Sequence, residues 1–400
     1  MKILAVICEY NPFHNGHAYQ LRKQKEELDC DGVVCLMSGS FVQRGEPAMF
    51  DKWSRCEMAL NSGCDLVLEL PVLYSLQSAE GFARGGVSLL SKLGLEGYLG
   101  FGSESGNIDA LISASEIMDS SDFHVAVKES LSTGISYPKA CADVLSKLSG
   151  GSFDLNESPN DILGIEYIKS LKTEASQLKP SIIKRTGSSH DSLTPVDGYM
   201  SASGIRNAIQ DGRDVSSFMP KEAYSIVMRE IRAGKGPVLP EDISSLLCYA
   251  VTSHDREWLA DISGVSEGIE KRIADSVAAN RSFEGIVSGA KTKRYPQTRI
   301  QRILMNMLLS IRKEDEKLSQ SYARVLGLNA KGAEILRQMQ KLSDIPIVTK
   351  TADASFSDEG SNRLFQLDVL ATDIYSLLYP KKSAGRNGMD FYRSPIILYS

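Results

Sequence analysis

The stretch that decides the fold of this chain runs from Lys2 to His17 and reads KILAVICEYNPFHNGH. Residues 2–7 are apolar and rich in β-branched side chains, a pattern that predicts a buried strand. Residues 18–28 follow a helical pattern, so the strand leads through a short loop into a helix. Because a helix start presents unpaired backbone N–H groups and the positive end of the helix dipole, this loop suits phosphate.

Two histidines, His14 and His17, stand at the start of this helix with Gly16 between them. Their spacing of three residues allows both rings to face one side of the first turn, and the glycine lets a ligand approach the backbone. Two imidazoles placed there could hydrogen-bond the charge that develops on a phosphate during nucleotidyl transfer. A histidine-rich turn without a ligand and half of a metal site are the alternatives, although a third metal ligand is not nearby in the sequence.

Alternating strands and helices follow over the first half of the chain. Strands are predicted at residues 32–37, 65–70, 97–102 and 181–184, and helices at 52–61 and 75–93. This alternation indicates a parallel sheet covered on both faces, in which ligands bind at the carboxyl ends of the strands. Residues 107–148 have a helical pattern without a strand, which predicts an insertion or a lid.

Several polar residues follow the predicted strands. Arg44 lies in the loop 38–47, which could contact an acyl substrate or a nucleotide, or be a solvated surface loop. Lys52 and Arg55 begin the next helix and are either ligands or solvated helix charges. Arg185 ends the fifth strand, where it can reach a phosphate or stack on an adenine.

Two later helix starts are also candidate anion sites. Ser158 precedes Pro159 and Asn160, so it could cap a helix whose start favours anions, or it could be an ordinary cap. Ser203 is predicted to cap a second helix, with Arg206 one turn further on. A hydroxyl and a guanidinium aimed at phosphate are one interpretation of that pair, and an ordinary capped helix with a solvated arginine is the other.

The alternation stops near residues 212–220, and the residues 234–240 are typical of a linker. From residue 241 onwards the pattern is helical apart from a strand-like run at 345–349. We therefore predict an α/β domain over residues 1–232 and a mostly helical domain over residues 238–400. A chain of 400 residues is long enough for two cores.

A basic segment lies in the predicted helical domain, with no acidic residue between Gly285 and Lys313. Its cations could neutralise RNA phosphates and Tyr295 could stack on an unpaired base, although a solvated helix start is the alternative. Because the net charge is −5, an RNA surface on this protein has to be a local patch. The cations of this segment are Lys291, Lys293, Arg294, Arg299 and Arg302, and Lys381, Lys382 and Arg386 form a weaker second patch.

Composition points to the cytoplasm as the location. The seven cysteines are scattered without CxxC pairs, as expected for buried apolar thiols in a reducing compartment rather than for disulfides or a zinc site. No apolar run is long enough to span a membrane, and the N-terminus has no signal-peptide pattern.

The motif from Asn11 to His17 resembles the HIGH motif of the nucleotidyltransferase superfamily. More narrowly, the chain resembles the bacterial tRNA(Met) cytidine acetate ligase family. The matching segments occur in order over most of the chain, at residues 9–17, 40–48, 101–106, 158–164 and 298–302. The Ser203–Arg206 pair is similar to the second signature of the superfamily, which binds the triphosphate.

The resemblance implies a Rossmann-like, parallel-sheet ATP-binding domain followed by a helical tRNA-binding domain. His14, His17, Ser203 and Arg206 would be catalytic, and Arg44 and the basic segment would contact acetate or tRNA. The implied ATP contacts are Ile7, Cys8, Glu9, Tyr10, Asn11, Pro12, Phe13, His14, Asn15, Gly16, His17, Ala18, Tyr19, Gln20, Gly102, Asn160, Arg185 and Thr186.

The implied reaction has two steps. Acetate attacks the α-phosphate of ATP to give acetyl-adenylate and pyrophosphate, and the acetyl group passes to N4 of the wobble cytidine of elongator tRNA(Met), releasing AMP. Mg²⁺ is expected to accompany ATP without assigned protein ligands, and the oligomeric state is open.

Two other functions fit parts of the sequence. An adenylyltransferase of a small phosphorylated metabolite would use the same N-terminal motif but leaves the basic segment unexplained. A non-catalytic RNA-binding protein with a vestigial nucleotide site would predict that His17→Ala leaves every function intact.

Overall fold

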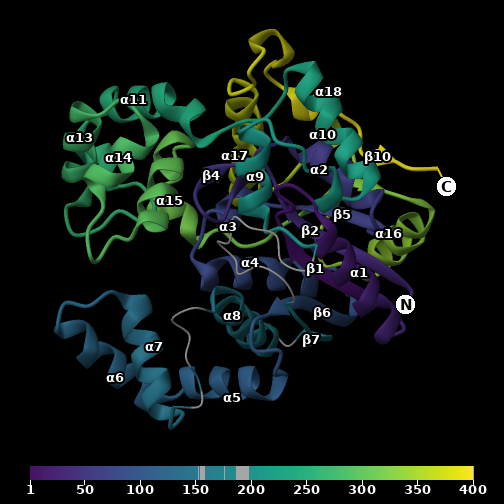
Figure 1. Cartoon of the computed structure of the whole chain (residues 1–400), viewed down its shortest axis with the longest axis horizontal. Helices are drawn as coiled ribbons and strands as arrows, with labels where there is room; N and C mark the ends of the chain where they lie inside the picture. Colours follow the sequence, from purple (N-terminus) through teal and green to yellow (C-terminus); the bar gives the residue numbers. More distant parts are fainter. Residues whose placement is uncertain (152, 154–157, 175, 186–197, 400) are drawn as a thin grey trace.

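A computed structural model describes residues 1–151, 153, 158–174, 176–185 and 198–399 of the chain (Figure 1). Its centre is one mixed β-sheet. The strands of this sheet are β1 (Lys2–Cys8), β2 (Gly32–Ser38), β5 (Leu66–Leu70), β6 (Glu96–Ser103), β7 (Leu178–Lys184), β8 (Ala323–Leu328), β9 (Ile347–Val348) and β10 (Ile396–Ile397). A separate hairpin consists of β3 (Phe41–Val42) and β4 (Glu46–Pro47).

The strand order is β10-β8-β5-β2-β1-β6-β7, with β9 also paired to β8. Neighbours among β1, β2, β5, β6 and β7 are parallel, which confirms the predicted parallel α/β core. Strand β1 is central because its residues are apolar on both sides. Ile3, Ala5 and Ile7 enter one hydrophobic cluster, whereas Leu4, Val6 and Cys8 enter the other.

Helices cover the two faces of the sheet. Residues of α4 and α8 pack in the cluster of Ile3, and residues of α1, α2, α9 and α10 pack in the cluster of Leu4. The helices of the first half are α1 (Asn15–Glu27), α2 (Lys52–Leu60), α3 (Val72–Ser75), α4 (Ala79–Lys92), α5 (Ile108–Met118), α6 (Ser121–Ser132), α7 (Tyr137–Leu148), α8 (Pro159–Thr173), α9 (Ala202–Gln210) and α10 (Lys221–Ala233). Helices α5, α6 and α7 lie in the stretch 107–148, for which a helical pattern without a strand is predicted, and they extend away from the sheet (Figure 1).

The helix predicted at residues 75–93 is interrupted. Helix α3 ends at Ser75, and α4 begins at Ala79 because the Ser78 hydroxyl caps it by accepting a hydrogen bond from the Gly81 N–H. The second half of the chain holds α11 (Ser244–Thr252), α12 (Arg256–Ala260), α13 (Ile269–Ala279), α14 (Phe283–Ala290), α15 (Gln297–Leu308), α16 (Ala330–Leu342), α17 (Glu359–Ser376) and α18 (Met389–Tyr392).

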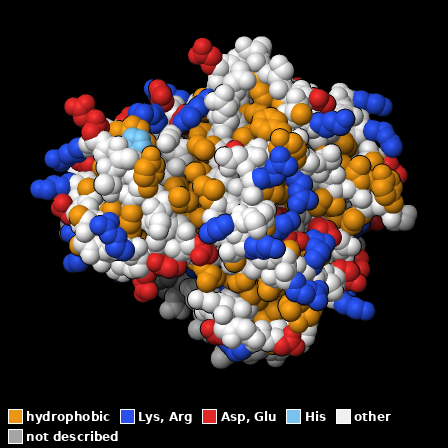
Figure 2. Space-filling view, turned by 90° about the horizontal axis from the view of Figure 1, so that it is seen from above, with side chains coloured by type: hydrophobic (Ala, Val, Ile, Leu, Met, Phe, Trp, Pro, Cys, Tyr) orange, Lys and Arg blue, Asp and Glu red, His pale blue; other side chains and the backbone are white. Residues whose placement is uncertain are grey.

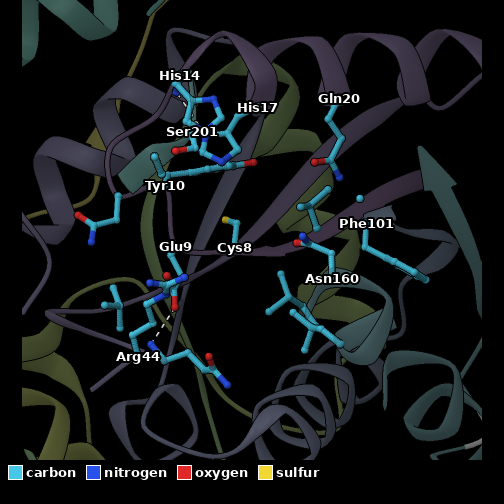
Figure 3. A pocket seen from close by; sticks show the side chains of 18 of the residues that line it. Cys8, Glu9, Tyr10, His14, His17, Gln20, Arg44, Phe101, Asn160 and Ser201 are labelled. Carbon is cyan, nitrogen blue, oxygen red and sulfur yellow. Dashed lines mark hydrogen bonds between the residues drawn. The ribbon is translucent and has the colours of Figure 1, made fainter. Parts of the chain in front are cut away.

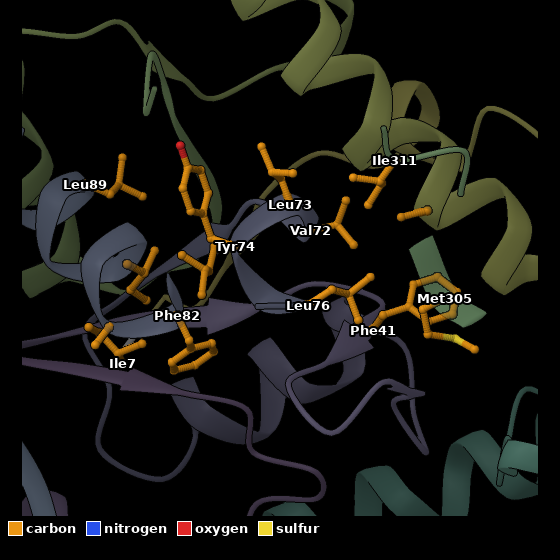
Figure 4. Close-up of a cluster of buried hydrophobic side chains, with 14 of the residues drawn as sticks. Ile7, Phe41, Val72, Leu73, Tyr74, Leu76, Phe82, Leu89, Met305 and Ile311 are labelled. Carbon is orange, nitrogen blue, oxygen red and sulfur yellow. The ribbon is translucent and has the colours of Figure 1, made fainter. Parts of the chain in front are cut away.

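The C-terminal part of the chain returns to the first sheet, which differs from the predicted succession of two domains. Strand β8 pairs antiparallel with β5, and β10 pairs with β8, so residues beyond 238 complete the sheet. Residues 323–328 were expected to be helical because a short apolar run does not distinguish a strand from a buried helix. Helix α15 also joins the central core, where Met305 lies beside Phe41 of β3 (Figure 4).

A buried network of four charged side chains fastens this returning segment to the sheet. The Lys52 ammonium lies 2.7 Å from a Glu69 carboxylate oxygen and 2.9 Å from Asp390. Arg324 of β8 lies 3.1 Å from Glu69 and 2.7 Å from Asp390. All four side chains are at most 4% exposed, so Lys52 is a structural group and neither a ligand nor a solvated helix charge.

The chain shows no sign of a membrane helix within the described ranges, since none of the helices there is both long and apolar enough to cross a bilayer.

Asp390→Asn should lower the stability of the protein by roughly 3–5 kcal/mol, because it leaves Lys52 and Arg324 buried with one carboxylate between them. The midpoint of urea unfolding measures this loss. Asp353→Asn, which changes an exposed carboxylate, is the matched control. Equal midpoints for the two variants would contradict a structural role of the network.

Candidate active site

A pocket of about 250 Å³ lies at the carboxyl ends of β1 and β6, between the starts of α1 and α9 (Figure 3). His14 and His17 enter it from one side, and Arg44 from the β3–β4 hairpin enters it from the other. This is the edge of the sheet at which the sequence predicts a ligand.

The two histidines are held by the backbone at the start of α1. His14 caps the helix, and its Nδ1 accepts a hydrogen bond from the Gly16 N–H at 3.1 Å. The Nδ1 of His17 accepts one from the His14 N–H at 3.2 Å, and the two rings stack 3.6 Å apart. Because each Nδ1 is an acceptor, the hydrogen-bond pattern assigns the proton of each neutral ring to Nε2.

Both rings are neutral at physiological pH. Burial lowers the pKa of His14 to about 3, and the nearby Arg185 and Arg206 add to the effect. Burial also lowers the pKa of His17 well below its ordinary value, helped by His14 and Arg185. The site therefore presents two imidazole N–H donors that add no charge of their own.

The start of α9 lies against the histidine loop. The Arg206 guanidinium donates to the Asn11 carbonyl oxygen at 2.9 Å and to the Ser203 hydroxyl at 3.1 Å. The predicted cap of this helix was wrong: Ser201, not Ser203, is the cap, and its hydroxyl accepts from the Gly204 N–H at 3.0 Å. The predicted cap lies two residues too late in the chain, because Ser201 and Ser203 both precede the same apolar pattern.

Comparison with known proteins agrees with this geometry. The family model described as HIGH Nucleotidyl Transferase matches residues 1–390. The tRNA(Met) cytidine acetate ligase of Acetivibrio thermocellus is 38% identical, and the match covers 100% of both chains. The crystal structure of apo Thermotoga maritima TmcAL is similar with a TM-score of 0.94, and the structure of the same protein bound with alpha-thio ATP with a TM-score of 0.91. Both are 34% identical to this chain, and both matches cover 100% of each chain.

The chain belongs to the tRNA(Met) cytidine acetate ligase family. This confirms the resemblance that the histidine motif and the later segments indicate.

Most ATP contacts expected from this family lie around the pocket. The predicted contacts that line it are Ile7, Cys8, Glu9, Tyr10, Asn11, His14, His17, Gln20, Gly102, Asn160 and Arg185. Gly16 and Tyr19 line a smaller adjoining cavity. Pro12, Phe13, Asn15 and Ala18 line neither, and Thr186 lies outside the described residues.

Two of these non-lining residues have structural contacts instead. Phe13 is fully buried and packs against Tyr10 and His17, with ring centroids 4.6 and 5.4 Å apart. The Asn15 side chain donates to the Ser217 carbonyl oxygen at 2.9 Å.

The start of α8 is not an open anion site, contrary to its sequence pattern. Ser158 is at the cap position but makes no side-chain cap. Glu104 takes that place, since its carboxylate accepts from the Asp161 N–H at 2.9 Å and from the Asn160 side chain. The Asp161 side chain in turn accepts from the Ser105 N–H at 3.0 Å. The Glu104 carboxylate therefore already occupies the start of α8.

Arg55 lies beneath the pocket and is completely buried. Its guanidinium donates to the Glu9 carbonyl oxygen at 2.6 Å, to Ser38 at 3.0 Å, to Phe50 at 3.0 Å and to Gly39. Arg55 therefore joins the ends of β1 and β2, and the interpretation of Arg55 as a ligand or a solvated charge was wrong.

A carboxylate also enters the pocket. The Glu9 side chain accepts from the Gln43 N–H at 2.8 Å, and burial raises its pKa, although Gln43, Arg206, Arg55 and Arg44 counteract the rise.

Sequence reasoning did not name several further lining residues one by one. Val42, Gln43, Glu46, Phe101 and Leu163 lie in segments that match the family, which was the available signal, whereas Phe82 and Tyr167 come from helices without such a signal. The missed residues include Val42, Gln43, Glu46, Phe82, Phe101, Leu163, Tyr167 and Ser201.

The basic segment lies outside the pocket but touches the hairpin that lines it. Gln301 of α15 donates to Glu46 at 2.8 Å, and Arg302 donates to the Gln43 carbonyl oxygen at 3.4 Å. Burial and the neighbouring Arg299 lower the pKa of half-buried Arg302 to about 10.

The remaining side chains of this segment differ in exposure. Lys291, Lys293 and Arg294 are exposed, and Arg294 pairs with Glu267 at 3.0 Å. The expectation that Tyr295 stacks on a base is wrong. Tyr295 is 4% exposed, its hydroxyl donates to the Ser266 carbonyl oxygen, and the Arg299 guanidinium covers its ring.

The second basic patch, Lys381, Lys382 and Arg386, is exposed on the segment after α17. Figure 2 shows Lys and Arg side chains gathered near the centre of the face seen from above. Within the described ranges, no three His, Cys, Asp or Glu side chains are grouped to hold a metal ion.

The two imidazoles should remain neutral, with their protons on Nε2, from pH 8 down to about pH 5. Histidine-selective ¹⁵N NMR reports both the tautomer and the protonation state, and His14→Gln and His17→Gln assign the signals. Uptake of a proton by either ring near the ordinary pKa of 6.5 would contradict the burial argument.

The free energy of unfolding should fall as the pH drops below about 6.5. The unfolded chain takes up two protons there that the folded chain does not, because both pKa values are lower in the folded state. Urea titrations between pH 7 and 4 measure the slope, which should be shallower in His17→Gln. An unchanged slope in that variant would show that His17 protonates in the folded protein.

Proposed function

We propose that this protein is an ATP-dependent tRNA(Met) cytidine acetate ligase. The observation that carries the proposal is the meeting of two helix starts at one pocket, with two neutral imidazoles on α1 and Arg206 on α9. Relatives named tRNA(Met) cytidine acetate ligase match over the whole chain, and a TmcAL structure of the same fold holds alpha-thio ATP.

ATP would lie in the pocket with its phosphates between the starts of α1 and α9. Acetate attacks the α-phosphate, and pyrophosphate leaves. The Nε2–H groups of His14 and His17 and the Arg206 guanidinium donate hydrogen bonds to the phosphate oxygens as charge develops on them. Ser203 supports this by holding Arg206 at 3.1 Å, so the protein mainly positions the reactants and stabilises charge.

Mg²⁺ would accompany ATP and neutralise part of the phosphate charge. Its ligands would be mainly phosphate oxygens and water, since the described residues show no ready group of metal ligands.

The acceptor is the N4 amine of the wobble cytidine of elongator tRNA(Met). This base lies in an anticodon loop and is already unpaired, which lowers the cost of placing it in a pocket. The basic segment would contact phosphates of the tRNA, in the cytoplasm, with acetate as the acyl substrate.

Mass analysis of nucleosides tests the proposal directly. Unmodified tRNA(Met) incubated with the protein, ATP and labelled acetate should yield labelled N4-acetylcytidine. His17→Ala should abolish most of the product, and His124→Ala, which changes an exposed histidine on the insertion, should not. Pyrophosphate release with a small phosphorylated acceptor, and no acetylcytidine, would instead indicate a metabolite adenylyltransferase.

Arg299→Glu and Lys293→Glu should each weaken tRNA binding by about tenfold and reduce its salt dependence, because each removes a phosphate contact. Filter binding at several salt concentrations measures both effects, and ATP binding serves as the internal reference. Lys341→Glu, an exposed lysine on α16, is the control. If Arg299→Glu and Lys293→Glu bind tRNA as tightly as the unaltered protein does, the RNA surface lies elsewhere.

A further inference from the structure

A second cavity, of about 360 Å³, lies beside the ATP pocket. The two cavities share four lining residues, Arg44, Glu46, Ser203 and Arg206. They are therefore neighbours across the tip of the β3–β4 hairpin and the start of α9.

The walls of this cavity combine an apolar floor with a polar rim. Pro47, Met49 and Val238 are buried and form the floor, which is fixed by a 2.9 Å hydrogen bond from the Val238 N–H to the Met49 carbonyl oxygen. Asn207 and Gln210 on α9 are exposed and form part of the rim. The exposed amide groups of the rim suit an unpaired nucleobase, because they can hydrogen-bond to its polar edge.

Glu46 is the carboxylate at the junction of the two cavities. One of its oxygens accepts from the Gln301 side chain at 2.8 Å, and Gln301 itself is buried. This contact fixes the carboxylate without neutralising it, because the amide is uncharged. A carboxylate is also the group that accepts a hydrogen bond from the N4 amine of cytosine.

The same junction touches the basic segment. The backbone of Arg302 packs so closely on Gly45 that a Cβ there would lie 2.4 Å from the Arg302 nitrogen. In Figure 1, β4 lies between α15 and α9. RNA phosphates on the basic segment would thus be near the cavity beside α9.

We propose that the second cavity binds the acceptor cytosine and that Glu46 accepts the proton of its N4 amine. This inference rests on the proposed function and adds to it the site of the acceptor base. The cytosine lies over the floor of the cavity, with Asn207 and Gln210 at its polar edge. Its N4 reaches the junction, where the acetyl-adenylate lies on the other side.

The chemistry of the step balances without another reactant. The N4 lone pair attacks the acetyl carbonyl carbon, and an N–C bond forms while the C–O bond to the AMP phosphate breaks. One N4 proton passes to the Glu46 carboxylate and from there to water. The products are N4-acetylcytidine, AMP and a proton.

Two rates separate this inference from the proposed function. Acetate-dependent exchange of labelled pyrophosphate into ATP reports acetyl-adenylate formation, and single-turnover acetylcytidine formation on tRNA(Met) reports transfer. In Glu46→Gln the ratio of transfer to exchange should fall by about 100-fold or more, and acetyl-adenylate should accumulate on the protein. In Gln210→Leu the KM for tRNA should rise by about tenfold, because the variant loses a hydrogen bond to the base. Gln210 is exposed, so this substitution leaves the core unchanged.

Matched controls are Glu96→Gln, at the amino end of β6, and Gln340→Leu, exposed on α16. An unchanged ratio in Glu46→Gln, or an equal loss of exchange and transfer, would overturn the role of Glu46. An unchanged KM in Gln210→Leu would overturn the placement of the base. If the unaltered protein forms acetyl-adenylate but no acetylcytidine, the proposed function fails, and this inference fails with it.

Discussion

The site depends on a buried guanidinium. Arg55 is fully enclosed, and it donates to backbone carbonyl oxygens at the ends of β1 and β2 and in the segment before α2. Burial lowers the pKa of this arginine, and the nearby Tyr375, Asp51 and Glu9 partly restore it. Since a buried charge is tolerated only when it is paired or hydrogen-bonded, the carbonyl oxygens cannot move away without leaving Arg55 unsatisfied. The loop with the histidines and the hairpin with Arg44 are thus held in one place relative to each other.

Above that anchor, the site gathers donors and keeps its histidines uncharged. Arg44, Arg185 and Arg206 bring positive charge to the pocket, whereas the two imidazoles contribute neutral N–H groups. Neutral rings stacked 3.6 Å apart avoid the repulsion that two imidazolium ions would have. The arrangement suits a triphosphate whose charge shifts during the reaction, because donors are already in place and need no reorganisation.

The helical region is coupled to this site through a few short contacts. Gln301 and Arg302 touch the β3–β4 hairpin, and β8 returns to pair with β5. The buried pairs of Arg324 and Lys52 with Glu69 and Asp390 hold that return in position. Consequently, the surface proposed to bind RNA and the pocket proposed to bind ATP belong to one continuous core, which is a suitable arrangement for passing an acyl group between two bound substrates.

The sequence by itself determined the central parallel strands, the histidine loop before α1 and the basic character of residues 291–302. Each of these follows from a local pattern: apolar runs that are buried on both sides, residue spacing within one helical turn, and charges close in the chain. Only the tertiary structure decided that Glu104 closes the start of α8, that Tyr295 is buried and that β8 completes the sheet. It also decided which distant side chains meet, such as Arg206 with Asn11 and Gln301 with Glu46. The physical reason is that such contacts join residues 195 and 255 positions apart, and packing of the whole core, rather than any local pattern, brings them together.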